Sequence, residues 1–487
     1  MPFMENTDIY RLHMGQAKCA LDLGDGSERG EYVDQDYILQ VLGRPHRGIN
    51  LMYCYYPLDK GWPVRASELA QNGKVGFAWD YAYDDYFPYQ GGLEGNTNGE
   101  PFRSMRDVRR HGQDVILTLT VDCAVSDEQL IRIAEDLRPF GRLMLRINHE
   151  ATGTWFAFNK RYTYQQVADF YVRFHNIIKK YAPNIKTILC IGDDHPEGNG
   201  RMKCEDEFAE AIKAADIWST DTYVALHWGW PFDIAESGGK SHKRTGNGES
   251  FNSFNFEYGR FMERADGKSR QFVISEFNAD GDVTGPFEQA EQLADFYKRL
   301  PEEAPCIKGV TFYQFRDRGR LGLEIEDPNN KNTGCAQPIL EEYKKILNME
   351  PYLPVMTLGE KANFSARLRW GGSEDSDGLL ISLQFDQNPV FCEVTFSGED
   401  TNLNLMMEIN GRWFYKAPGV KTIDLIPAFF NSRFKERKEI PLRIFAPPPD
   451  GANDPAQGKD WEINYYAQMR NLPELRIRYA PAMPFLY

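Results

Sequence analysis

The chain has 487 residues, of which 42% are hydrophobic and 26% charged, a balance that excludes disordered and membrane-embedded proteins. Its formal net charge of −15 disfavours a nucleic-acid partner, because binding phosphate requires clustered Lys and Arg. A chain of this length exceeds one ordinary core, so we expect one large domain and at least one smaller one.

The eight cysteines are spread without a CxxC pair, which argues against a zinc site or a disulfide scaffold. The first residues lack a basic segment followed by an apolar one, and no run of about 18 apolar residues occurs. We therefore expect no membrane partner and, for the sequence as written, a cytoplasmic protein, or a secreted one if a signal peptide has been removed. The oligomeric state stays open.

Short apolar runs alternate with helical patterns over residues 46–350, after an ambiguous segment 1–45 that we expect to add a strand to a β domain. The eight predicted strands are 48–56, 75–79, 114–121, 142–148, 187–192, 217–224, 271–277 and 309–315. Between them, Ser126 with Gln129 forms a capping box, and several runs have helical spacing. The count predicts a (β/α)8 TIM barrel; a doubly wound open sheet is the alternative, but no Gly-rich fingerprint follows the first run.

Beyond residue 350 the helical spacing stops and alternating runs follow. Val390, Cys392, Val394 and Phe396 share one face of such a run. We predict that residues 351–487 form an all-β sandwich, which either buttresses the barrel or covers one end of a cleft. The tryptophans of this region fit a sugar-binding face or, better, core packing: Trp370, Trp413 and Trp461.

Two glutamates end strands of the predicted barrel, where active sites of this fold lie. Glu150 closes the fourth strand and Glu276 the seventh, and these strand ends face each other across the barrel mouth. Hydrolysis of a glycosidic bond requires two carboxyl groups that flank it. A lone strand-end glutamate is more often part of a hydrogen-bond network, but the matched pair favours catalysis.

The stretch "RINHEATGTWF" (146–156) resembles the acid/base strand of the clan A glycoside hydrolases, most closely family 26, the β-mannanase family. In that family a His precedes the acid/base Glu and a Gly-x-Trp follows it. The resemblance implies that Glu150 is the acid/base, that Glu276 is the nucleophile, and that His149 orients Glu150 or contacts the sugar. We expect Glu150 to be protonated and Glu276 ionised in the resting enzyme.

Other segments extend the resemblance and limit it. "AADIWSTDTYV" resembles the family's sixth strand, which implies a hydrogen bond from Tyr223 to the nucleophile. Asn148 is typical of other clan members, and "TFYQFRDRG" stands where a Trp usually forms the floor of the sugar subsite, so Tyr313, Gln314 or Phe315 takes that place.

Aromatic and polar residues near the strand ends predict sugar contacts, because pyranose faces stack on rings while their hydroxyls need directional partners. Rings that merely pack over the barrel rim are the alternative. The predicted substrate-binding residues are Trp79, Asp80, Asn148, His149, Trp155, Tyr223, His227, Trp228, Trp230, Tyr313 and Gln314.

These features predict a retaining β-glycoside hydrolase that cleaves a β-linked oligo- or polysaccharide, β-mannan or a related β-glycan, by double displacement. We expect a carbohydrate substrate and no cofactor or metal. A catalytically inactive carbohydrate-binding barrel is the alternative, against which the presence of both carboxylates argues. A metal-dependent barrel hydrolase ranks last, because no His-x-His closes the run 48–56. Asp280 and Asp282 have calcium-like spacing but lack further ligands, so we predict a turn there.

Overall fold

The computed structural model describes residues 9–15, 18–25, 33–59, 62, 87–111, 113–153, 156–191, 206–225, 249–317, 319–327, 329–352, 356–361, 366–368, 375–385, 388–432, 434, 436–446 and 467–479. The statements on structure below concern these residues.

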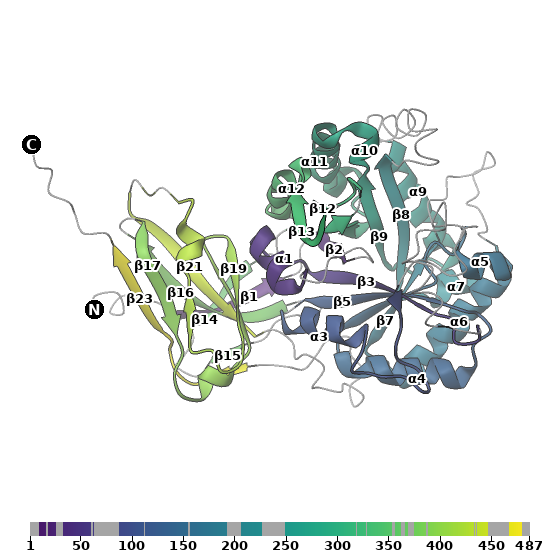
Figure 1. The fold of residues 1–487 in the computed structure, drawn as a ribbon, viewed down its shortest axis with the longest axis horizontal. Coiled ribbons are helices and arrows are strands. Elements are labelled where there is room, and N and C mark those ends of the chain that lie inside the picture. Colours follow the sequence, from purple (N-terminus) through teal and green to yellow (C-terminus); the bar gives the residue numbers. More distant parts are fainter. Residues whose placement is uncertain are drawn as a thin grey trace, which may run out of the picture.

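Eight parallel strands close into a barrel with helices around it, which confirms the predicted (β/α)8 fold (Figure 1). Closure is direct, because the last strand pairs with the first and the first with the second. In order, the strands are β2 (Ala20–Asp25), β3 (Gly48–Tyr55), β5 (Asp114–Val121), β6 (Leu143–Ile147), β7 (Ile185–Cys190), β8 (Ile217–Ala225), β9 (Gln271–Ala279) and β10 (Ile307–Phe312).

The first barrel strand is β2, so Gly48–Tyr55 is the second strand and not the first. β2 is only six residues long, and its interior position is taken by Asp22, whose carboxylate is buried against Arg47. An acidic residue in so short a run hides the strand pattern. The predicted strand 75–79 lies outside the described residues, and β4 (Phe87–Pro88) adds a two-residue pairing beside β3.

Helices follow most barrel strands. They are α1 (Gln35–Leu42), α3 (Phe102–Arg110), α4 (Asp127–Leu137), α5 (Ala157–Arg161), α6 (Tyr164–Tyr181), α7 (Ala209–Ala214), α9 (Glu249–Arg264), α10 (Gly281–Thr284), α11 (Pro286–Glu303) and α12 (Pro338–Leu347). The capping box of Ser126 and Gln129 begins α4. Asp280 is the N-cap of the one-turn helix α10 and accepts a hydrogen bond from the Asp282 N–H at 2.8 Å. No helix in these ranges is long and apolar enough to cross a membrane.

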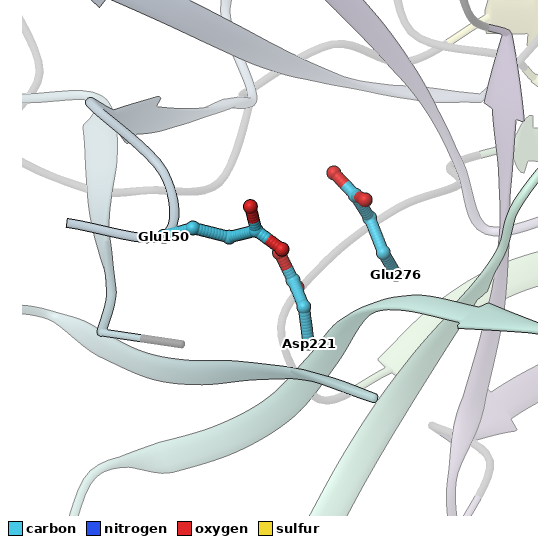
Figure 2. Close-up of side chains that lie close together, drawn as sticks. All are labelled: Glu150, Asp221 and Glu276. Carbon is cyan, nitrogen blue, oxygen red and sulfur yellow. The ribbon is translucent and has the colours of Figure 1, made fainter. Parts of the chain in front are cut away.

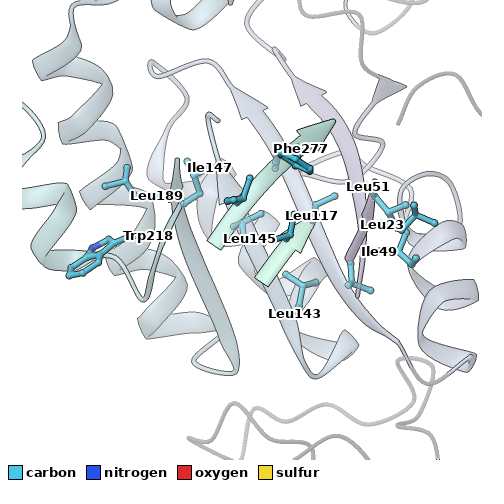
Figure 3. Packing of buried hydrophobic residues seen from close by; sticks show 14 of the residues in the cluster. Leu23, Ile49, Leu51, Leu117, Leu143, Leu145, Ile147, Leu189, Trp218 and Phe277 are labelled. Carbon is cyan, nitrogen blue, oxygen red and sulfur yellow. The ribbon is translucent and has the colours of Figure 1, made fainter. Parts of the chain in front are cut away.

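Alternation along the strands separates two apolar layers. Leu143, Leu145 and Ile147 of β6 belong to the large core between strands and helices, part of which Figure 3 shows. Met144 belongs instead to a second cluster, with Ile116, Ile188, Ile217 and Val273 from the neighbouring strands, which fills the barrel interior. The same alternation turns Arg146 of β6 inward.

The C-terminal region forms antiparallel sheets, as predicted for an all-β sandwich. The largest has the order β14 (Met356–Lys361), β1 (Ile9–Gly15), β16 (Asp375–Phe385), β21 (Lys438–Phe445), β18 (Leu405–Ile409) and β19 (Arg412–Lys416). The smaller ones are β20 (Thr422–Asp424) with β17 (Pro389–Thr395) and β23 (Glu474–Tyr479), and β15 (Ala366–Leu368) with β22 (Ala467–Met469). The N-terminal segment thus supplies β1 to this domain and β2 to the barrel.

The sandwich core lies between the large sheet and β17. Cys392, Val394 and Phe396 are buried in it with Leu379 of β16. Val390 is 59% exposed, contrary to the predicted face, because the register of β17 shifts between Pro389 and Phe391. A third small sheet, β11 (Arg316–Asp317), β12 (Glu324–Asp327) and β13 (Asn330–Ala336), follows β10.

The sandwich packs against the end of the barrel that carries the strand N-termini. The backbone N–H of Trp413 donates to the Gly43 carbonyl at 3.1 Å, and the Tyr415 ring lies 4.8 Å from the His111 ring. Gly43 precedes β3 and His111 precedes β5, so this contact supports the barrel from the side opposite its C-terminal mouth. Trp413 also stacks on Phe445 at 5.9 Å, whereas Trp370 and Trp461 lie outside the described residues.

A buried histidine at this end of the barrel makes stability depend on pH. His46 Nε2 lies 2.9 Å from the Tyr343 hydroxyl, and burial, with help from Arg44, lowers the pKa of His46 to about 3. In the unfolded chain a histidine has a pKa of about 6.5. Between that pH and about 3, the unfolded state therefore binds a proton at His46 and the native state does not. This contribution to stability is present above about pH 6.5 and is lost as the pH falls toward 3.

We therefore expect His46→Gln to flatten the pH dependence of the free energy of unfolding. Near pH 5 the slope should fall by about 1.4 kcal/mol per pH unit, the value for one proton. Urea unfolding between pH 4.5 and about 7.5 measures this slope. Tyr343→Phe, which keeps the histidine buried, should leave the slope unchanged, and equal slopes in His46→Gln and wild type would contradict the prediction.

Candidate active site

The structure brings the two predicted catalytic glutamates together at the C-terminal mouth of the barrel. Glu150 lies in the turn after β6, and Glu276 lies in β9. Oxygens of Glu150, Glu276 and a third carboxyl group, Asp221 of β8, all lie within 4.8 Å of one another (Figure 2). Asp221 was missed by the sequence reasoning, although its position two residues before Tyr223 places it on the same face of the strand.

A β-bulge directs Glu276 inward. Thr220 of β8 pairs with Ile274, but the next residue, Asp221, pairs with Glu276, so Ser275 is the extra residue in β9. Strict alternation from the interior residue Val273 would turn Glu276 toward the helices. Because of the extra residue, Glu276 points into the barrel instead, and Phe277 is the next residue to point outward. The Phe277 ring stacks on the Phe296 ring of α11, with 3.9 Å between the ring centres.

Arg146 hydrogen-bonds to two of the carboxylates, those of Asp221 and Glu276, from inside the barrel. It is fully buried, donates to Glu276 Oε1 at 2.7 Å, and approaches both oxygens of Asp221 at 3.3 Å. Its Nε donates to the Thr118 hydroxyl at 2.7 Å. Burial opposes its charge, but Asp221 and Glu276 outweigh burial and raise the pKa of Arg146. This residue was also missed, and its signal was an Arg at an inward position of an apolar run.

Two more residues surround the Glu276 carboxylate. The Tyr223 hydroxyl donates to Oε2 at 2.9 Å, and burial and the Glu276 charge raise the pKa of Tyr223 far above its ordinary value. His149 Nε2 lies 3.7 Å from Oε1, and burial and Arg146 hold the pKa of His149 well below its ordinary value. Tyr223 is therefore a permanent donor, and His149 is neutral at physiological pH.

The turn that carries Glu150 has an unusual backbone. Asn148 and Glu150 have φ angles of 46° and 49°, in the left-handed region that L-residues rarely occupy. The Asn148 side chain holds this turn against β5: its Oδ1 accepts from the Val121 N–H at 2.6 Å, and its Nδ2 donates to the Val121 carbonyl at 3.1 Å. The Ala151 N–H donates to the Cys190 carbonyl at 2.9 Å. Asn148 thus fixes the place of Glu150.

We expect Asn148→Ala to lower the free energy of unfolding by about 2–3 kcal/mol, through two lost hydrogen bonds and an unfavourable left-handed alanine. Turnover should fall as well, because Glu150 loses its support. A matched control is Asn410→Ala, which removes a left-handed Asn (φ 52°) with two side-chain hydrogen bonds in the sandwich. The control should lose stability but not the specific activity of the folded fraction; equal activities for both variants would contradict this role.

The residues after β10 differ in their relation to the site. The Tyr313 ring meets the Tyr223 ring edge-on at 6.2 Å, which places it beside the residue that donates to Glu276. Gln314 is buried, and the Phe315 ring packs edge-on against Tyr37 of α1 at 5.9 Å. Tyr313 is therefore the candidate for the floor of the sugar subsite. The remaining predicted sugar contacts lie outside the described residues: Trp79, Asp80, Trp155, His227, Trp228 and Trp230.

The three carboxyl groups are also the one group of acidic residues in the described ranges that is spaced to hold a metal ion. Arg146 already donates to Glu276 and Asp221, so a guanidinium provides positive charge at this place. The guanidinium offsets part of the carboxylate charge, and we assign no metal to this site.

A scan against protein-family models finds no match, and neither does a search of the curated proteins. Among solved structures, the chain is similar to a modular endo-β-1,4-mannanase from Cellulomonas fimi, with 12% identity, a TM-score of 0.43, and 88% of this chain and 89% of that chain covered. A family 26 β-mannanase from Bacteroides ovatus matches with 12% identity and a TM-score of 0.40, over 69% of this chain and 92% of that one.

A family 51 α-L-arabinofuranosidase from Bifidobacterium longum matches with 9% identity and a TM-score of 0.46, over 90% and 99%. These similarities concern the fold, so the activity rests on the geometry of the site.

Proposed function

We propose that the protein is a retaining β-glycoside hydrolase acting on a β-linked oligo- or polysaccharide of the β-mannan type or a related β-glycan. The observation that carries this proposal is the approach of Glu150 and Glu276, whose oxygens lie within 4.8 Å. Retaining enzymes place their carboxyl groups about 5–5.5 Å apart, whereas inverting ones leave about 6.5–9.5 Å for a water molecule.

The surroundings of the two glutamates support different roles. Glu276 receives hydrogen bonds from Arg146 and Tyr223, which favour the ionised form of a nucleophile. Glu150 is half-buried at the rim and reaches the same space from the opposite side of the barrel mouth. This asymmetry favours Glu150 as the proton donor, and it speaks against a barrel that only binds sugar, which has no need of a charged nucleophile held by two donors.

The proposed reaction has two displacements. A Glu276 oxygen attacks the anomeric carbon as the glycosidic C–O bond breaks, and the Glu150 proton passes to the departing oxygen. Glu150 then takes a proton from water, whose oxygen attacks the same carbon while the ester bond to Glu276 breaks. Two inversions give net retention, and both carboxyl groups return to their first state.

Labelling with a slow substrate tests this proposal. A panel of dinitrophenyl β-glycosides carries fluorine in place of the hydroxyl next to the anomeric carbon, so that the glycosyl-enzyme accumulates. We expect one sugar of the panel to add a single glycosyl group per chain, on the peptide that contains Glu276, as seen by mass spectrometry. Glu276→Gln should stay unlabelled; a label on another carboxylate, or none from a sugar whose ordinary aryl glycoside is hydrolysed, would refute the assignment.

A further inference from the structure

The site contains a third carboxyl group, that of Asp221, whereas the proposed reaction uses only two. Asp221 is 2% exposed, and its oxygens lie within 4.8 Å of oxygens of both Glu150 and Glu276. In the view of Figure 2 the Glu150 and Asp221 carboxyl groups point toward each other, and the Glu276 side chain enters the same space from another strand. With three ionised carboxylates, the guanidinium of Arg146 and a neutral His149, the group would carry two uncompensated negative charges in the barrel interior.

Such a group takes up a proton, because like charges at this separation disfavour joint ionisation. Glu276 is the least suited to hold it, since Arg146 donates to one of its oxygens at 2.7 Å and Tyr223 to the other at 2.9 Å. Asp221 is approached by one guanidinium nitrogen at 3.3 Å from each of its oxygens, and it accepts from the Cys190 thiol and the Glu276 backbone N–H. Its burial nevertheless disfavours the charged form more than these donors favour it.

The charged and titratable groups that face Asp221 come from four strands: Arg146 and Glu150 from β6 and its turn, Cys190 of β7, Tyr223 of its own strand and Glu276 of β9. Burial, and then the Glu276 charge, raise the pKa of Asp221 to about 8 against the opposing effect of Arg146. Burial also raises the pKa of Cys190 well above its ordinary value, and that of Tyr223 likewise, so both groups stay neutral. Among the residues that the structure describes, Arg146 is then the one cation that faces the carboxyl groups.

We propose that Asp221 and Glu150 share a single proton in the resting protein, and that Asp221 is the positioning residue that keeps the acid/base protonated at neutral pH. This role rests on the proposed function. The four charged groups then carry one net negative charge at rest. They carry the same charge in the glycosyl-enzyme, in which Glu276 is a neutral ester and the shared proton has left with the leaving group. The water that completes the reaction returns the proton to the pair.

Infrared spectroscopy detects this proton without any substrate, because a protonated carboxyl group has a C=O stretching band that an ionised one lacks. At neutral pH, we expect the spectrum of wild type minus Asp221→Asn to show such a band, and that of wild type minus Glu150→Gln to show the same one. A matched control is Asp400→Asn, because Asp400 is equally buried in the sandwich, where it accepts backbone N–H groups. That difference spectrum should lack the band.

The absence of the band from both site difference spectra would overturn the proposal, whether or not the protein hydrolyses a glycoside. A band without hydrolysis of any sugar would leave the shared proton in place and refute the proposed function instead. Should Asp221→Asn fail to fold, Glu150→Gln decides the question, since Glu150 lies at the rim and packs less tightly.

With an active substrate, the pH profile separates this role from a structural one. In Asp221→Asn, Glu150 loses a negative neighbour, so its pKa falls and the alkaline limb of kcat/KM should move to lower pH by about one unit or more. A residue that only supports the fold would lower kcat/KM by the same factor at every pH. An unmoved limb in a folded variant would therefore overturn the proposal.

Discussion

Glu276→Ala should lose turnover by a factor on the order of 10⁴ or more, the scale on which removal of a covalent nucleophile acts. Azide should restore part of the rate, because the small anion fits the space left by the carboxylate and attacks the anomeric carbon from the same side. The product is then the α-glycosyl azide, since one displacement inverts a β-linked substrate. Nuclear magnetic resonance of the product identifies the anomer.

Glu150→Ala is the complementary variant. It should retain formation of the glycosyl-enzyme from dinitrophenyl substrates, whose leaving group needs no proton, and azide should then give the β-glycosyl azide by attack on that intermediate. Glu408→Ala is a matched control, because it removes a buried glutamate that pairs with Arg443 in the sandwich. The control should lose stability but not kcat. Wild-type rates in both Glu276→Ala and Glu150→Ala would contradict the assignment of these two residues as nucleophile and acid/base.

The predictability of the fold differs from strand to strand. The apolar runs of β5, β6 and β9 predict strands because buried strands of a parallel barrel are nearly continuous in hydrophobic residues. β2 fails this pattern, since its interior position holds Asp22 paired with Arg47 from the following segment. Such a pairing is a tertiary contact, which the local sequence pattern of β2 does not predict.

The site shows the same limit. A carboxylate at a strand end predicts Glu150, and the sequence motif predicts His149 and Tyr223 near it. The inward turn of Glu276 depends on the extra residue Ser275, whose hydroxyl hydrogen-bonds with that of Ser219 on the neighbouring strand. A bulge of this kind arises from pairing between strands, so it follows from the assembled sheet and not from the spacing of residues in one strand.

Neither Arg146 nor Asp221 was predicted, although each occupies an inward position of its strand: Arg146 among the apolar residues of β6, and Asp221 among hydroxyl-bearing residues of β8. A charged residue at such a position is unfavourable alone and becomes favourable only when the barrel closes and brings its partner within reach. The polar layer at the mouth, in which Arg146 joins Thr118, Asp221 and Glu276 from three other strands, is therefore a product of closure.

Arg146→Met should have the largest effect on stability in the site. It removes the guanidinium that donates to Asp221 and Glu276 and leaves their charges buried, which is expected to lower the free energy of unfolding by about 3–5 kcal/mol near neutral pH. The loss should shrink as the pH falls, because the native variant neutralises its carboxyl groups by taking up protons that the unfolded chain binds only at lower pH. Urea unfolding at several pH values measures this dependence.

Arg146→Lys keeps the positive charge but loses the planar guanidinium with its three donor nitrogens. It therefore separates the effect of the charge from the effect of the hydrogen-bond geometry. A single ammonium group cannot reach Thr118, Asp221 and Glu276 in the directions that Nε, Nη1 and Nη2 serve. We expect it to recover most of the stability lost in Arg146→Met, while kcat stays roughly 10²- to 10³-fold below wild type, the scale of one misplaced electrostatic partner. A lysine variant with full activity would mean that charge alone suffices, and a methionine variant of undiminished stability would mean that Asp221 and Glu276 carry no negative charge that Arg146 stabilises.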